Sequence, residues 1–208
     1  MSNKIKIYLA GPDVFYPTDL EEGRKKVDLC LAYGFEGIYP SFLLPHDLFT
    51  GEYSQDEKAQ IIKSQCVYGI QEADIIMANL SPFRGHEMDS GTAFELGFAA
   101  ALNKPIYGYT TDPRTYLQRM QEDTEGVYCD ENNVWRDQYH DVIENVGLVE
   151  NCMIGASCKK IIKPQCYIKE TSASELFVLT LSQIHQDLDL EIVNNVNNIK
   201  QKSKTPSY

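Results

Sequence analysis

Two carboxylates lie close together in a stretch of sequence that is otherwise small or apolar. Residues 90–103 read SGTAFELGFAAALN, with Glu95 as their only charge, and Asp89 directly precedes them. An isolated buried carboxylate is costly, so it is expected to be paired, protonated or used in a reaction. Two carboxylates beside a cavity are typical of glycosyl transfer, in which one attacks the anomeric carbon and the other handles a proton or a hydroxyl group. The structural alternative is that Asp89 only caps a helix and Glu95 lies on a solvated face.

Several further residues are suited to a sugar and a base at the same place. Tyr8 lies near the end of the first predicted strand, where its hydroxyl can hold a nucleophilic carboxylate by a hydrogen bond. Small residues let a sugar approach the backbone, aromatic rings offer a base a flat surface, and an arginine can bind a phosphate or cap a helix. The expected binding residues of this group are Gly11, Phe15, Asn79, Arg84 and Gly91.

The elements that must position these residues alternate between strands and helices. The predicted strands are residues 4–11, 35–40, 74–80 and 104–110. The predicted helices between them are residues 18–34, with Asp19 as N-cap, 55–73, and 90–103, with Asp89 or Ser90 as N-cap. This order predicts an α/β fold, a flavodoxin-like doubly wound parallel sheet with flanking helices. Ligands of such sheets bind at the carboxyl ends of the strands, where the loop at 41–54 and the carboxylates would meet.

The second half of the chain has a weaker pattern. We expect a helix at 112–123, a polar loop at 128–141 that Trp135 anchors, and a helix at 172–193. The whole is expected to form one domain, residues 1–195, followed by a polar tail at 196–208.

Composition excludes several classes of function. The net charge of −11 argues against a nucleic-acid partner, because phosphate backbones require clustered Lys and Arg. No apolar run is long enough to cross a membrane and the N-terminus has no signal-peptide pattern, so we expect a cytoplasmic protein. The six cysteines are scattered without a C-x-x-C pair, which favours free thiols over disulfides or a metal site. No metal or organic cofactor is expected.

Three segments of the sequence resemble the nucleoside 2-deoxyribosyltransferase family. They read IYLAGPDVF, ADIIMANLSPFRGHEMDSGTAFELGFAAALNKP and GLVENCM, and the likeness spans most of residues 4–155. The resemblance implies a pentosyltransferase of nucleotide salvage that exchanges the base of a 2′-deoxynucleoside for another free purine or pyrimidine base. Glu95 would form a covalent deoxyribosyl ester, Asp89 would contact the sugar hydroxyls and Tyr8 would orient Glu95. Asn151, donated by a neighbouring subunit, would complete the site, which implies a homo-oligomer with shared active sites.

The chain departs from the family pattern at one position. An Asp or Asn that helps to protonate the leaving base usually lies eight residues before Asp74, where this chain has Cys66. A thiol is a weak hydrogen-bond donor, so either Gln65 takes part or the base is handled differently. Some family members also place a C-terminal tyrosine carboxylate in the site. This sequence ends in Tyr208 as well, but the polar segment KQKSKTP before it has a composition typical of disorder, which argues against that role here.

Two other functions remain open at this stage. The first is a 2′-deoxynucleoside 5′-monophosphate N-glycosidase, a hydrolase, which needs a phosphate site. The aspartate of AGPDVFYP would repel a phosphate, and Arg84 is the only basic residue of the central loop. The second is a non-catalytic nucleotide-binding domain, against which the pair Asp89 and Glu95 argues. A dinucleotide-binding fold is weakly supported, since no G-x-G-x-x-G follows the first strand.

Overall fold

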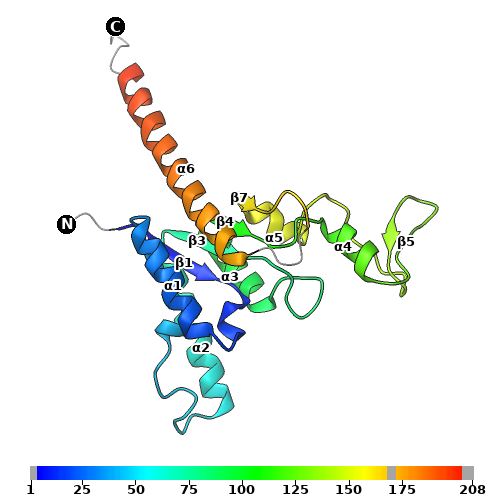
Figure 1. Cartoon of the computed structure of the whole chain (residues 1–208), viewed down its shortest axis with the longest axis horizontal. Coiled ribbons are helices and arrows are strands. Elements are labelled where there is room, and N and C mark those ends of the chain that lie inside the picture. The colour runs from blue at the N-terminus through cyan, green and yellow to red at the C-terminus, as the bar shows by residue number, and fades with distance from the viewer. Residues whose placement is uncertain (1–3, 168–171, 203–208) are drawn as a thin grey trace.

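A five-stranded parallel sheet forms the centre of the protein (Figure 1). The computed structural model describes residues 4–167 and 172–202, with side chains described as far as Glu191. The strands are β1 (Lys6–Ala10), β2 (Glu36–Ile38), β3 (Ile75–Asn79), β4 (Ile106–Tyr109) and β7 (Lys160–Ile162). Their order in the sheet is β2-β1-β3-β4-β7, with every neighbouring pair parallel. This is the flavodoxin-like order, so the predicted fold class is confirmed.

Helices cover both faces of the sheet (Figure 1). The helices α1 (Asp19–Ala32) and α6 (Ala173–Lys202) pack on one face, and α2 (Gln55–Glu72), α3 (Ser90–Ala101) and α5 (Cys152–Ser157) pack on the other. Successive residues of a strand point to opposite faces. In β1, Ile7 and Leu9 therefore join the core under α1 and α6, whereas Tyr8 and Ala10 face α2 and α3. This alternation turns the Tyr8 side chain toward the helix that carries Glu95.

Polar side chains fix where the helices begin. Ser54 and Glu57 form a capping box at the start of α2, which was not predicted. Of the two N-caps predicted for α3, Asp89 and Ser90, the structure has Asp89. The predicted cap Asp19 was wrong: Thr18 is at the N-cap of α1, and Asp19 lies in the first turn. The reason is a tertiary contact, because the Asp19 carboxylate accepts hydrogen bonds from the hydroxyl groups of Tyr39 and Ser41.

The second half of the chain differs most from expectation. Strand β7 was not predicted; its three residues are ordered mainly by pairing with β4, which a single sequence does not reveal. A two-stranded hairpin, β5 (Tyr128–Cys129) and β6 (Trp135–Arg136), lies where a loop was expected, with Trp135 half-buried. The predicted helix at 112–123 begins later, as α4 (Tyr116–Asp123), because Thr115 caps it.

The last helix also extends beyond its predicted end. We expected it to end at 193 and a polar tail to begin at 196, but α6 continues to Lys202 and projects past the sheet (Figure 1). Each residue added to a formed helix gains a further backbone hydrogen bond, which favours such continuation. Tyr208 lies outside the described residues. Within the described residues, none of the helices combines the length and the apolar character needed to cross a membrane.

Candidate active site

A tyrosine and a glutamate form a buried pair at the carboxyl end of the sheet. The Tyr8 hydroxyl donates a hydrogen bond of 2.5 Å to Oε1 of Glu95, and both side chains are buried. The pKa of Glu95 is raised to about 7, mainly by burial and to a smaller extent by the nearby charge of Asp89, while hydrogen bonds from Tyr8 and Cys66 oppose the shift. Burial and the neighbouring Glu95 raise the pKa of Tyr8 far above its ordinary value, so its hydroxyl stays a donor.

Close packing by α2 holds the Tyr8 ring in place. Gly69 is buried in α2, and a Cβ atom there would lie 2.8 Å from Cε2 of Tyr8. This distance is well inside van der Waals contact, so only glycine lets the helix backbone approach the ring this closely. The position of Tyr8, and with it the hydrogen bond to Glu95, therefore depends on the absence of a side chain at residue 69.

Asp89 faces the same region from the end of α3. Its Oδ2 atom accepts hydrogen bonds from the backbone nitrogen of Thr92 at 2.8 Å and from the Thr92 hydroxyl at 3.0 Å. Because both of these bonds use Oδ2, the other carboxylate oxygen can accept a bond from a ligand. Asp89 therefore combines the role of helix cap with a place in the wall of a cavity.

A cavity of about 640 Å³ opens beside these residues. Its wall combines the polar groups of α3 with apolar and aromatic residues of η1 (Pro12–Phe15), of η2 (Pro40–Leu43), of the loop that follows and of α2. The predicted site residues in its lining are Gly11, Phe15, Asp89, Gly91 and Glu95. Its size and its mixture of apolar walls with a few polar groups suit a small organic ligand.

Asn79 does not line the cavity but contacts residues that support its wall. It is buried, and its side-chain nitrogen donates to Asp13 at 3.3 Å while its oxygen accepts from the backbone of Ser81. Asp13 in turn forms a 2.8 Å ion pair with the buried Lys26 of α1. A Cβ atom on Gly11 would lie 2.8 Å from both Asn79 and Asp13, so this corner requires glycine. These contacts fix η1, which carries Phe15 into the cavity.

Three of the predicted binding residues lie elsewhere in this chain. Arg84 is exposed, with its guanidinium 5.1 Å from the centre of the Phe15 ring, and lines a smaller adjoining cavity together with Asp89. Asn151 is exposed and caps α5, and its side-chain nitrogen donates to Glu144. Gln65 is half-buried, and it is its neighbour Cys66 that lines the large cavity.

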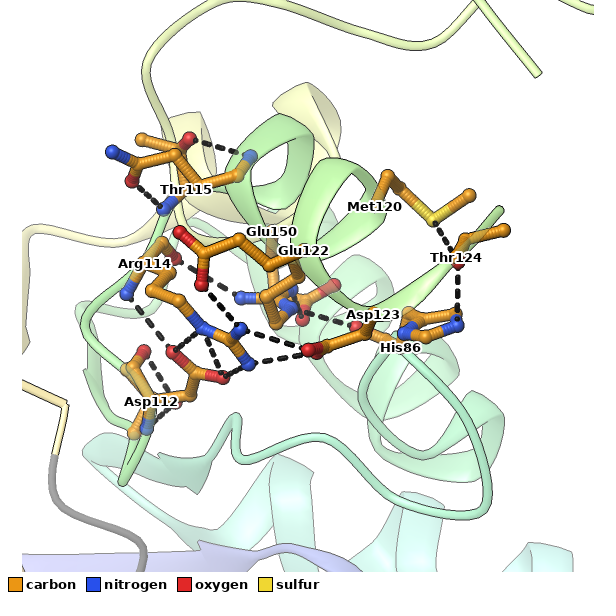
Figure 2. Close-up of polar contacts among 12 residues, drawn as sticks. His86, Asp112, Arg114, Thr115, Met120, Glu122, Asp123, Thr124 and Glu150 are labelled. Atoms are coloured by element: carbon orange, nitrogen blue, oxygen red, sulfur yellow. Dashed lines mark hydrogen bonds and ion pairs between the residues drawn. The ribbon is translucent and has the colours of Figure 1, made fainter. Parts of the chain in front are cut away.

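The arginines behind the loop at 82–90 are engaged in ion pairs (Figure 2). Arg114 contacts the carboxylates of Asp112, Asp123 and Glu122 at 2.6 to 2.9 Å. Arg119 is buried and pairs with Glu150 at 2.7 Å. The charges of Arg114 and Arg119 are thus balanced within the protein. The ion pairs therefore stabilise the position of the loop at 82–90 more than they provide a site for an anion.

Sequence reasoning missed four residues that shape the site. Asp19, His46 and Cys66 line the cavity, and Lys26 supports η1 from α1. Cys66 was noticed only as a departure from a motif, and His46 is a loop histidine that the sequence pattern does not single out. Lys26 lies in a run of charges, RKKVD, which gave no signal that its charge is buried. Only the tertiary fold brings these residues to the site.

Comparisons with known proteins agree with the architecture. A family model described as Nucleoside 2-deoxyribosyltransferase matches residues 7–153. A solved 2-desoxiribosyltransferase from Leishmania mexicana is 28% identical, with a TM-score of 0.56 over 86% of this chain and 97% of that one. A conserved protein from Enterococcus faecalis V583 is 19% identical with a TM-score of 0.53, over 87% and 99% of the two chains, which shows the fold alone.

A curated relative has no described function. It is an uncharacterized protein from Schizosaccharomyces pombe, 33% identical over an alignment of 124 residues that covers 55% of this chain and 54% of that protein. The match therefore spans about half the length of that relative. Because the family match covers most of the chain and includes Tyr8, Asp89 and Glu95, the protein belongs to the nucleoside 2-deoxyribosyltransferase family.

Proposed function

We propose that this protein is a nucleoside 2-deoxyribosyltransferase that exchanges the base of a 2′-deoxynucleoside through a deoxyribosyl ester of Glu95. The observation that carries the proposal is the buried Glu95 carboxylate, held by Tyr8 at the edge of a cavity of about 640 Å³. Purine or pyrimidine bases, as nucleosides or free, are the proposed substrates, and the reaction belongs to nucleotide salvage in the cytoplasm.

The carboxylate of Glu95 acts as the nucleophile. One of its oxygens forms a bond to C1′ while the bond from C1′ to the base nitrogen breaks, and the electron pair leaves with the base. With a pKa of about 7, roughly half of the Glu95 side chains are ionised at neutral pH. The hydrogen bond from Tyr8 fixes the carboxylate and stabilises its ionised form. Because the buried Glu95 carboxylate is poorly hydrated, its negative charge can stabilise the positive charge that develops at the oxocarbenium-like C1′.

Other residues of the cavity wall are placed to contact different parts of the substrate. The free oxygen of Asp89 is placed to accept hydrogen bonds from sugar hydroxyls, and Gly91 leaves room for the sugar beside the backbone. Phe15 and Phe49 provide flat apolar surface for the base. An occupied cavity would also exclude water from the ester, which favours transfer to a second base over hydrolysis.

We further propose that the active site is shared within a homo-oligomer. Asn151 is exposed, and the neighbouring Met153 exposes 74% of its surface. On α3, which packs against α5, Phe94 exposes 54% of its surface and stacks on Phe98 at 6.5 Å. Exposed apolar side chains of this kind are typical of an interface between subunits. A partner on this surface would bring its own Asn151 to the assembly.

A nucleoside substrate is better supported than a 5′-monophosphate. A phosphate site needs available cations. The carboxylates around Arg114 already balance its charge (Figure 2), and Glu150 balances that of Arg119. This leaves the exposed Arg84, which stacks on Phe15 and Phe83, as the arginine that a phosphate could reach. The hydrolase that cleaves nucleoside monophosphates is therefore the second candidate, and it differs from the transferase in both substrate and acceptor.

A chromatographic exchange assay tests the proposal. Purified protein with deoxyinosine and adenine should form deoxyadenosine, with little free hypoxanthine released when adenine is left out. The variant Glu95→Ala should lose roughly 10³-fold or more of the rate, whereas the control Glu72→Ala, which removes an exposed carboxylate paired with Lys6, should keep it.

Two results would contradict the proposal. Equal release of base with and without adenine, or turnover restricted to deoxyinosine 5′-monophosphate, would identify a hydrolase. Binding of deoxynucleosides without any turnover would identify a non-catalytic domain.

A further inference from the structure

We propose that His46 is the proton carrier for the base, donating a proton to the leaving base and accepting one from the incoming base. This inference rests on the proposed transferase function and extends it to a residue that the sequence gave no reason to choose. Its physical basis is the fate of the electron pair that remains on the base nitrogen when the C1′–N bond breaks. Without a proton the base leaves as an anion, so a general acid in the cavity accelerates the step.

The titratable groups that face the cavity come from each element around it. Five side chains of the lining can in principle gain or lose a proton: Asp19, His46, Cys66, Asp89 and Glu95. The carboxylates already have other partners. Asp19 accepts hydrogen bonds from Tyr39 and Ser41, Asp89 caps α3, and Glu95 is the proposed nucleophile. A carboxylate whose oxygens are engaged as hydrogen-bond acceptors, or that bonds to C1′, is poorly placed to donate a proton to the base.

Cys66 is poorly suited to the task although it lies at the expected place. Burial and the neighbouring Glu95 raise the pKa of its thiol to about 11, while Tyr8 opposes the shift. The thiol therefore keeps its proton at neutral pH and is a weak hydrogen-bond donor. It cannot deliver a proton to a base nitrogen and recover it within a catalytic cycle as an acid near neutrality can.

His46 has the position and the chemistry that Cys66 lacks. It lies on the loop between η2 and α2, in the part of the wall that also contains Leu44, Pro45 and Phe49. This apolar surface is where a base would lie, whereas Asp89 and Gly91 line the wall proposed for the sugar. Histidine changes its charge close to neutral pH, and the exposure of His46 allows it to exchange protons with solvent.

The proton balance closes over the two half-reactions. In the first, protonated His46 transfers its proton to the ring nitrogen of the leaving base as Glu95 bonds to C1′. His46 is then neutral and the sugar is an ester. In the second, the incoming base attacks C1′ through its ring nitrogen and its N–H proton passes to His46. The ester bond breaks, and both Glu95 and His46 return to their starting states.

A pair of substrates separates proton donation from other roles of His46. Deoxyinosine needs a proton on its leaving base, but 7-methyl-2′-deoxyguanosine carries a positive charge on its base, which leaves neutral without one. For His46→Gln, which keeps a hydrogen-bonding group without an exchangeable charge, we expect kcat/KM with deoxyinosine to fall about 100-fold. With the methylated substrate it should stay within a few-fold of the wild type.

The matched control is His185→Gln, which removes an exposed histidine paired with Asp189 on α6 and should change neither rate. The pH profile adds an independent readout. The wild-type rate with deoxyinosine should fall at alkaline pH, where a protonated histidine is lost, and His46→Gln should lose this fall while keeping the rise with pH that ionisation of Glu95 causes.

The other possible outcomes would contradict either the role of His46 or the transferase function itself. An equal loss with both substrates would assign His46 to binding or packing and overturn its role as a proton carrier, as would an unchanged rate with deoxyinosine. Glu95→Ala should lose activity with both substrates. If the wild type turns over neither substrate, the transferase function itself is wrong and the role of His46 fails with it.

Discussion

At the scale of single residues, burial of Glu95, the proposed nucleophile, has a cost to stability. Its pKa of about 7 means that the folded protein binds a proton on this carboxylate more tightly than the unfolded chain does. Between the ordinary value near 4.5 and 7, the native state therefore holds more protons than the unfolded state, and the free energy of unfolding falls as pH rises through this window. Above about pH 7 the full cost is present.

The variant Glu95→Gln should therefore be more stable relative to the wild type at high pH. We expect the difference in free energy of unfolding, variant minus wild type, to grow by about 2–3 kcal/mol between pH 4.5 and 8, at about 1.4 kcal/mol per pKa unit. Urea denaturation at several pH values measures it. Glu72→Gln, at an exposed position, should show no such dependence. A difference that stays constant over this range would mean that burial does not raise the pKa of Glu95.

Residues differ in how well the sequence reveals them. Glu95 and Asp89 could be chosen because a charge inside an apolar helix is unusual, and the structure brings both to one cavity, where the fully buried Tyr8 holds Glu95 by a hydrogen bond. Their catalytic roles stay predictions. Lys26 and His46 could not be chosen, because a lysine among charges and a histidine in a loop are ordinary in sequence. Only their tertiary neighbours distinguish them.

At the scale of elements, a buried ion pair joins η1 to the body of the protein. Asp13 of η1 contacts Lys26 of α1, and the Lys26 ammonium also donates to the hydroxyl of Tyr109 on β4 at 3.1 Å. Both charged side chains are only 7% exposed. Removing one partner of such a pair leaves an uncompensated buried charge, whereas removing both does not.

A double-mutant cycle tests this link. Lys26→Met should lower the free energy of unfolding by roughly 3 kcal/mol and raise KM for the nucleoside, because η1 carries Phe15. Adding Asp13→Asn to Lys26→Met should recover part of the lost stability, since no isolated charge remains. Urea unfolding and steady-state kinetics of Lys26→Met, Asp13→Asn and the double variant measure both effects. Additive losses would show that the two residues are not coupled.

Elements were predictable where their signals are local. The helices α2 and α3 begin at polar caps, and the apolar strands β1, β3 and β4 lie where the hydrophobic runs placed them. The misses share a different cause. Strand β7 depends on pairing with β4, and the first residues of α1 are arranged by contacts from Asp19 to Tyr39 and Ser41. Such tertiary contacts have no signature in a single sequence.

At the scale of the whole molecule, the order of strands and helices was enough to predict the fold, since parallel strands with helical crossovers have few arrangements. Assembly was not predictable from the chain's own pattern. The exposed Phe94, stacked on the half-buried Phe98, forms with Met153 and Asn151 of the neighbouring α5 a surface that one subunit does not cover. We proposed above that a second subunit covers it.

Co-expression of two inactive variants tests a shared site. Glu95→Ala and Asn151→Ala should each be inactive alone. If each site combines Glu95 of one subunit with Asn151 of another, every mixed dimer should regain one of its two sites, up to about half of the wild-type activity. The assay is deoxyinosine–adenine exchange by material purified through two different tags.

A second pair of variants is the control. Glu95→Ala and Asp89→Ala affect residues of the same subunit's cavity, so co-expression should restore nothing. Failure of both pairs to regain activity, or equal recovery by both, would contradict a site completed by Asn151.

Helix α2 presents two different surfaces to the site within one turn. Gly69 presses against the Tyr8 ring, and Cys66, three residues earlier, faces the cavity beside Glu95. A change at residue 69 would move the tyrosine that holds Glu95. A change at residue 66 would leave this packing in place, but it would replace a thiol that lines the cavity and hydrogen-bonds to Glu95. Residue 66 therefore offers directed evolution a position at which the cavity wall and the ionisation of Glu95 can both be altered while the Tyr8 ring stays where it is.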